Sequence, residues 1–114
     1  MRDEPMTHSS TPGTKEGTTV LKLSGPLTLS TIFGFQNDFR NMKPKVMILD
    51  LSETTYMDSA GLGLLVNYFV SAQDDGRKLL LAGVNHRIMA LFEMTKVQGV
   101  LKCYPTVADA EAIA

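Results

Sequence analysis

A nearly unbroken apolar run, Val46–Leu51, is the feature that most constrains how this chain folds. Asp50 is its only interruption, and runs of this kind are typical of strands that are covered on both faces. Residues 60–74 follow with the spacing of an amphipathic helix. Its apolar stripe consists of Leu62, Leu65, Val66 and Phe69. A buried strand followed by such a helix is the building unit of α/β proteins.

The same alternation recurs along the rest of the chain. Short β-rich patterns occupy residues 18–24, 78–82 and 100–104. Helical patterns begin at Ser30 and Asn85, whose side chains can cap a helix N-terminus, and at Thr106. We therefore predict a single α/β domain with a mostly parallel, mixed sheet of four to five strands and about four helices. The first of these strands, residues 18–24, is the candidate for antiparallel pairing.

The N-terminal segment has a different composition. Residues 1–17 contain only two apolar side chains, Met1 and Met6, among Ser, Thr, Pro, Gly and charged residues. Such a segment cannot bury much apolar surface. We predict a flexible tail over residues 1–17 and a folded domain over residues 18–114.

Composition excludes several classes of function. The formal net charge is −1, which offers no general attraction to nucleic acids or anionic lipids. The single cysteine, Cys103, excludes an internal disulfide framework and a multi-cysteine metal site. No apolar run approaches the roughly 20 residues of a membrane span, and no signal peptide is recognisable. We expect a cytoplasmic protein with no nucleic-acid partner and no membrane insertion.

The densest candidate for function is the segment Asp50–Val66, which runs from a buried strand through a polar loop into a helix. Ligands and partners of parallel α/β sheets usually meet the carboxyl ends of strands and the helix starts that follow. Ser59 lies at such a start, where unpaired N–H groups and the helix dipole favour an anion.

Four interpretations of Ser59 compete. It is a plain helix N-cap, a nucleophile, part of a phosphate-binding loop, or a regulatory phosphorylation site. A nucleophile needs a nearby base, and the chain has only His8 in the tail and His86 at another helix start. A phosphate loop needs a fuller glycine pattern than Gly61-Leu62-Gly63.

This segment resembles the signature of the STAS domain, a family named for sulphate transporters and anti-sigma-factor antagonists. Asp58-Ser59-Ala60-Gly61-Leu62-Gly63 is similar to the Asp-Ser-x-Gly-Leu-Gly of the bacterial antagonists. Three weaker similarities are Gly25-Pro26-Leu27, Leu91-Phe92-Glu93-Met94-Thr95 and Tyr104-Pro105-Thr106. The resemblance covers about residues 18–113, the whole predicted domain.

The resemblance implies that Ser59 is the phospho-acceptor. It also implies a set of partner-binding residues, namely Thr28, Asp58, Ser59, Ala60, Gly61, Leu62 and Gly63. Two positions depart from the family pattern. Thr28 replaces an aspartate that lies near the phospho-acceptor, which bears on recognition by a kinase. Lys96 replaces the glycine that usually follows the Leu-Phe-x-x-Thr segment.

The function that the resemblance implies is that of a non-enzymatic binding switch without a cofactor. Unphosphorylated, the chain would bind an anti-sigma factor of the serine-kinase type and so release a sigma factor. Phosphorylation of Ser59 would end the binding and a protein phosphatase would restore it. A weak homodimer is left open. The alternatives are an unphosphorylated STAS subunit of a membrane transport assembly and a small-molecule or nucleotide sensor that uses the loop around Ser59.

Overall fold

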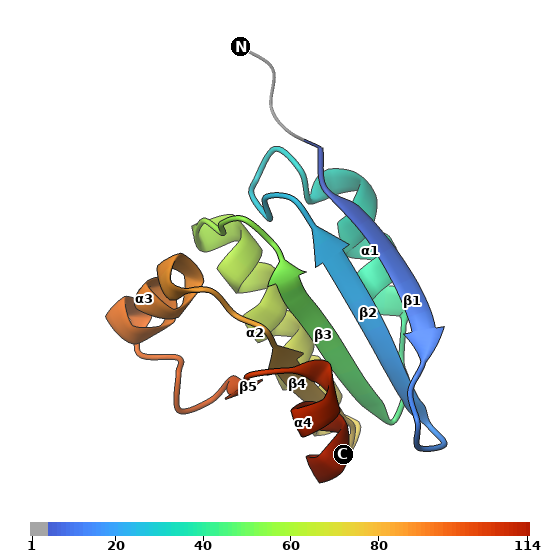
Figure 1. Cartoon of the computed structure of the whole chain (residues 1–114). Coiled ribbons are helices and arrows are strands. Elements are labelled where there is room, and N and C mark those ends of the chain that lie inside the picture. The colour runs from blue at the N-terminus through green and yellow to red at the C-terminus, as the bar shows by residue number, and fades with distance from the viewer. Residues whose placement is uncertain (1–4) are drawn as a thin grey trace.

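A computed structural model describes residues 5–114, which form one five-stranded sheet in the order β1-β2-β3-β4-β5 (Figure 1). The strands are β1 (Thr7–Pro12), β2 (Thr18–Ser24), β3 (Val46–Glu53), β4 (Lys78–Ala82) and β5 (Lys102–Tyr104). The helices are α1 (Phe33–Asn41), α2 (Ser59–Asp74), α3 (His86–Thr95) and α4 (Val107–Ile113). β1 pairs antiparallel with β2, and the other three pairings are parallel. The predicted α/β class and mixed sheet are confirmed.

The buried strand β3 has an apolar cluster on each face. Met47, Leu49 and Leu51 belong to the larger core, which includes residues of α1, α2 and α3. Val46 and Ile48 belong to a smaller cluster with Ala110 of α4. Because successive side chains of a strand point to opposite faces, covering both faces requires the continuous apolar run. In Figure 1, α1 and α2 lie behind the sheet and α4 lies in front of it.

The predicted flexible tail is wrong for residues 7–12, which form the edge strand β1. Ser10 pairs with Leu21 of β2 in its antiparallel register, so β1 is the antiparallel member of the sheet and β2 is parallel to β3. All six residues of β1 are exposed. An edge strand is joined through backbone hydrogen bonds, which need no apolar side chains. Residues 1–4 lie outside the described part of the chain.

The predicted helix cap at Asn85 is confirmed, and Thr106, where the last helical pattern begins, caps α4. The Asn85 side chain accepts from the Ile88 N–H at 2.9 Å, and Thr106 Oγ1 accepts from the Asp109 N–H at 3.1 Å. Ser30 is not a cap, because its hydroxyl lies 3.1 Å from Thr28 Oγ1 in a turn that precedes α1. The helix begins later than predicted, at Phe33, without a side-chain cap.

The buried side of α2 is broader than its predicted stripe. Leu62 and Leu65 are buried as expected, whereas Phe69 is only half-buried. Tyr68, outside the predicted stripe, is 5% exposed and its ring stacks on Phe39 of α1 at a centroid distance of 4.2 Å. The helix therefore packs against α1 as well as against the sheet, which widens its buried arc.

Candidate functional site

Two loops meet at the carboxyl ends of the parallel strands β2 and β3 (Figure 1). Leu27, in the loop after β2, forms a parallel bridge with Met57, in the loop after β3. The Leu27 N–H donates to the Tyr56 carbonyl at 2.9 Å, and the Asp58 N–H donates to the Leu27 carbonyl at 3.3 Å. These backbone contacts hold the start of α2 beside the first loop.

Asp58, rather than Ser59, is the N-cap of α2. One carboxylate oxygen of Asp58 accepts from the Ala60 and Gly61 N–H groups, both at 3.0 Å. Its other oxygen accepts from the Leu29 N–H at 3.1 Å. The carboxylate thus satisfies two unpaired donors of the helix and also fixes the neighbouring loop. The N-cap interpretation of Ser59 is wrong for this reason.

Ser59 is the first residue of α2, and its side chain is exposed. Within residues 5–114 its hydroxyl makes no side-chain hydrogen bond, to His86 or to any other group. The nucleophile interpretation consequently has no base in contact with this serine. The described residues also contain no group of three His, Cys, Asp or Glu side chains that could hold a metal ion.

The remaining predicted site residues differ in accessibility. Gly61 and Leu62 are buried beneath the surface, and Thr28 is 6% exposed. Ala60 and Gly63 are half-buried. The buried members determine the shape of the surface around Ser59, while Ser59 and its half-buried neighbours form the surface itself.

Thr28, at the position of the family aspartate, takes part in a local turn. Its N–H donates to Thr31 Oγ1 at 2.9 Å, and its hydroxyl lies 3.1 Å from Ser30 Oγ. The Thr31 hydroxyl in turn donates to the Pro26 carbonyl at 2.8 Å. The threonine therefore contributes to the conformation of the loop and adds no charge beside Ser59.

Sequence reasoning did not predict the exposed apolar side chains on this end of the sheet. Leu29 is 58% exposed, Phe33 is 65% exposed and Tyr56 is 41% exposed. The Arg87 guanidinium lies 5.4 Å from the centroid of the Tyr56 ring. We name Leu29, Phe33 and Tyr56 the apolar rim. The available signal was that Leu29 and Phe33 lie outside the helical apolar spacing of the first predicted helix, which consists of Ile32, Phe35, Phe39 and Met42.

A strand–loop–helix site of this kind, in a five-stranded mixed sheet with helices on both faces, defines a small α/β module that presents one serine at a helix start. A family model described as STAS domain matches residues 11–110. The chain belongs to the STAS domain family. In the part of the chain that the structure describes, no helix is both long enough and apolar enough to cross a membrane.

Two curated relatives that match the chain are named as antagonists. The chain is 39% identical over 57 residues to the anti-sigma-B factor antagonist of Listeria monocytogenes, a match that covers half of each chain. It is 29% identical over 84 residues to the anti-sigma-B factor antagonist of Staphylococcus aureus, covering 71% of this chain and 78% of that one. The match thus spans only about half the length of the Listeria relative.

Solved structures that share this fold include proteins of two kinds. An anti-sigma factor antagonist from Mycobacterium paratuberculosis superposes with a TM-score of 0.78 at 17% identity, over 94% of this chain and 93% of that chain. The murine Slc26a9 anion transporter superposes with a TM-score of 0.75 at 13% identity, over 99% of this chain and 22% of that chain. At these identities the likeness establishes the fold alone.

Proposed function

We propose that this chain is an anti-sigma-factor antagonist switched by phosphorylation of Ser59. Unphosphorylated, it binds an anti-sigma factor that is also a serine kinase, and a sigma factor is released in the cytoplasm. The observation that carries the proposal is the exposed, unbonded Ser59 hydroxyl at the start of α2, in a STAS chain whose curated relatives are named anti-sigma-B factor antagonists. The kinase and its ATP belong to the partner, so this chain needs neither catalysis nor a cofactor of its own.

The local fold tolerates a phosphate on Ser59. A helix N-terminus stabilises negative charge through its dipole and its N–H groups, and α2 has 16 residues. Asp58 holds the helix start independently of the Ser59 side chain. Phosphorylation can therefore add about −1.5 to −2 charges without removing the cap.

The same phosphate opposes binding of a partner. Leu29 and Tyr56 of the apolar rim lie in the two loops that meet at the start of α2. They suit a contact from which water is excluded, and a phosphate buried there loses its hydration. Asp58 adds a further negative charge beside it. A penalty of about 3–4 kcal/mol would weaken binding a few hundred-fold, because about 1.4 kcal/mol corresponds to tenfold.

Titration of the anti-sigma partner against wild type, Ser59→Ala and Ser59→Asp tests the proposal. Ser59→Ala should bind as wild type does but take up no phosphate from the kinase and ATP. Ser59→Asp should bind at least roughly tenfold more weakly, with circular dichroism confirming equal folding. Dephosphorylation of the phosphorylated wild type by a protein phosphatase should restore its affinity.

Ser71→Asp is the matched control, because it adds the same charge to an exposed serine of the same helix. It lies 12 residues, or about 18 Å, further along the axis, and should leave the affinity unchanged. Equal affinity for all variants, with no phosphate on Ser59, would refute the switch. That result would favour the second candidate, an unphosphorylated STAS subunit of a transport assembly, which the threonine at position 28 keeps open.

A further inference from the structure

A cavity lies between α1 and α2 and borders the surface around Ser59 through Ala60 and Gly63. Its volume is about 270 Å³. Six side chains with polar groups line it, namely Gln36, Arg40, Asn67, Tyr68, Ser71 and Arg77. No Asp or Glu side chain lines it among the described residues. Two guanidinium groups and no carboxylate in the lining favour a negatively charged occupant.

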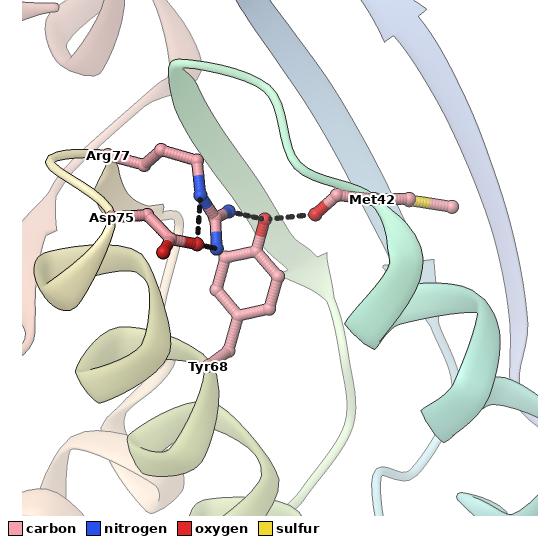
Figure 2. Close-up of polar contacts among 4 residues, drawn as sticks. All are labelled: Met42, Tyr68, Asp75 and Arg77. Carbon is pink, nitrogen blue, oxygen red and sulfur yellow. Dashed lines mark hydrogen bonds and ion pairs between the residues drawn. The ribbon is translucent and has the colours of Figure 1, made fainter.

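Arg77 is held rigidly at this cavity by the contacts drawn in Figure 2. Its Nε and Nη2 donate to one carboxylate oxygen of Asp75 at 3.3 and 3.0 Å. Its Nη1 donates to the Tyr68 hydroxyl at 3.2 Å, which itself donates to the Met42 carbonyl at 2.6 Å. Because these contacts tie Arg77 to α2 and to the end of α1, little side-chain entropy remains to be lost when a ligand binds.

The Arg77 side chain retains hydrogen-bonding capacity despite this network. Only 10% of the side chain is exposed. A guanidinium carries five N–H groups, of which three have acceptors among the described residues. Burial raises the pKa of the Tyr68 hydroxyl, so the phenol remains a neutral donor to Met42 at physiological pH.

Arg40 supplies the net positive charge of the cavity. Asp75 compensates the charge of Arg77, whereas Arg40 makes no ion pair within residues 5–114. The cavity therefore carries about one uncompensated positive charge, which suits an anion of low charge better than a nucleoside triphosphate.

The apolar part of the lining and the volume define the rest of the ligand. Ile32 and Leu64, which are 7% and 9% exposed, contribute apolar surface, and the volume lies just below the roughly 300–1,000 Å³ of sites for drug-sized ligands. We propose that this cavity binds a small organic anion, whose carboxylate or phosphate group is held by Arg40 and Arg77 and whose short apolar chain contacts Ile32 and Leu64.

Calorimetric titration of the full chain with hexanoate, hexyl phosphate, hexanamide and inorganic phosphate tests this proposal. At least one of the two six-carbon anions, hexanoate or hexyl phosphate, should bind. The one that binds more tightly identifies whether the cavity prefers a carboxylate or a phosphate. Neutral hexanamide, which lacks the charge, and inorganic phosphate, which lacks the apolar chain, should each bind at least about tenfold more weakly. In NMR spectra of the backbone amides, the shifts caused by the anion should centre on Gln36, Gly63, Asn67 and Ser71.

Two variants and one matched control test whether the anion binds in this cavity. Arg40→Gln removes an exposed charge and should weaken anion binding at least about tenfold. Gly63→Leu adds a side chain where a Cβ meets no atom within 4 Å and should block the cavity without unfolding the helix. Arg87→Gln, an exposed arginine of α3 that does not line the cavity, should bind as wild type does.

Three results would overturn the proposal. One is that neither hexanoate nor hexyl phosphate binds at concentrations up to about 10 mM, which is well above the dissociation constant expected of a weak but specific site. Another is equal affinity for hexanoate and hexanamide. The third is anion binding that survives both Arg40→Gln and Gly63→Leu. The switch at Ser59 is tested with its own partner, so the two proposals succeed or fail separately.

Discussion

At the scale of single residues, Gly61 and Gly63 have different roles although both belong to the same motif. A Cβ on Gly61 would lie 2.2 Å from the Leu27 carbonyl oxygen and 2.8 Å from Met57 Cγ. A Cβ on Gly63 would meet no atom within 4 Å. Gly61 is therefore needed for the close approach of the two loops, whereas Gly63 leaves space beside the helix.

Alanine substitutions should separate these two glycines. Gly61→Ala should lower the free energy of unfolding by about 1–3 kcal/mol, because the backbone of the Leu27 loop must move. Gly63→Ala should raise it by up to about 1 kcal/mol, because alanine is the better helix former. Urea denaturation measures both changes, and similar values for the two variants would contradict the assigned contact.

The cap of α2 provides a second prediction at this scale. Asp58→Ala should cost about 0.5–2 kcal/mol of stability, the usual range for loss of an N-cap. Ser59→Ala should change the stability by no more than about 0.5 kcal/mol, as expected for an exposed side chain without a bonded partner. Thermal unfolding of the two variants, with wild type alongside, gives the comparison. A larger loss for Ser59→Ala would make the serine a structural residue after all.

At the scale of elements, the end of α3 explains one departure from the family pattern. Lys96 is the C-cap of α3 and has left-handed backbone angles, with φ at 63° and ψ at 34°. It is the one non-glycine residue with positive φ in the described chain. Glycine adopts this conformation at no steric cost, which gives a physical reason for the family preference.

Lys96→Gly should therefore stabilise the protein by about 0.5–1 kcal/mol, because it relieves the strain of a left-handed residue with a Cβ. Glu93→Gly, at an exposed position within α3, should instead destabilise it by about 1 kcal/mol. Chemical denaturation of the pair measures both effects. Destabilisation by both changes would mean that the lysine side chain makes a compensating contact.

At the scale of the whole molecule, β1 covers the edge of β2 and reaches α1. The centroids of the His8 and Phe35 rings are 4.9 Å apart, and Met6 is partly buried against the larger core. The carbonyl oxygen of Pro5 would lie 2.5 Å from a Cβ on Gly25. The segment before β2 is thus packed against the domain, although its side chains are mostly polar.

Deletion of residues 1–12 should lower the melting temperature by at least about 4 °C, which corresponds to roughly 1 kcal/mol for a domain of this size. The deletion removes the β1–β2 hydrogen bonds and leaves the edge of β2 unpaired. Because an unpaired edge promotes association, the shortened chain should also elute earlier in size-exclusion chromatography. An unchanged melting temperature would instead support the flexible tail that the sequence predicts.

The sequence by itself determined the alternation of strands and helices, the doubly covered β3, the cap at Asn85, and the position of Ser59 at a helix start. These features follow from the spacing of apolar residues and from side chains that hydrogen-bond to the backbone within three residues. Each can therefore be predicted from a short segment of the sequence. Only the tertiary structure decided that β1 joins the sheet, that Asp58 caps α2, that Gly61 but not Gly63 is required, and that a cationic cavity lies between α1 and α2. These features depend on groups far apart in the chain, such as Leu27 against Gly61 or Met42 against Tyr68. A polar edge strand is held by backbone hydrogen bonds, and the two loops approach each other through backbone atoms. Because every residue has these atoms, no local sequence pattern predicts such contacts.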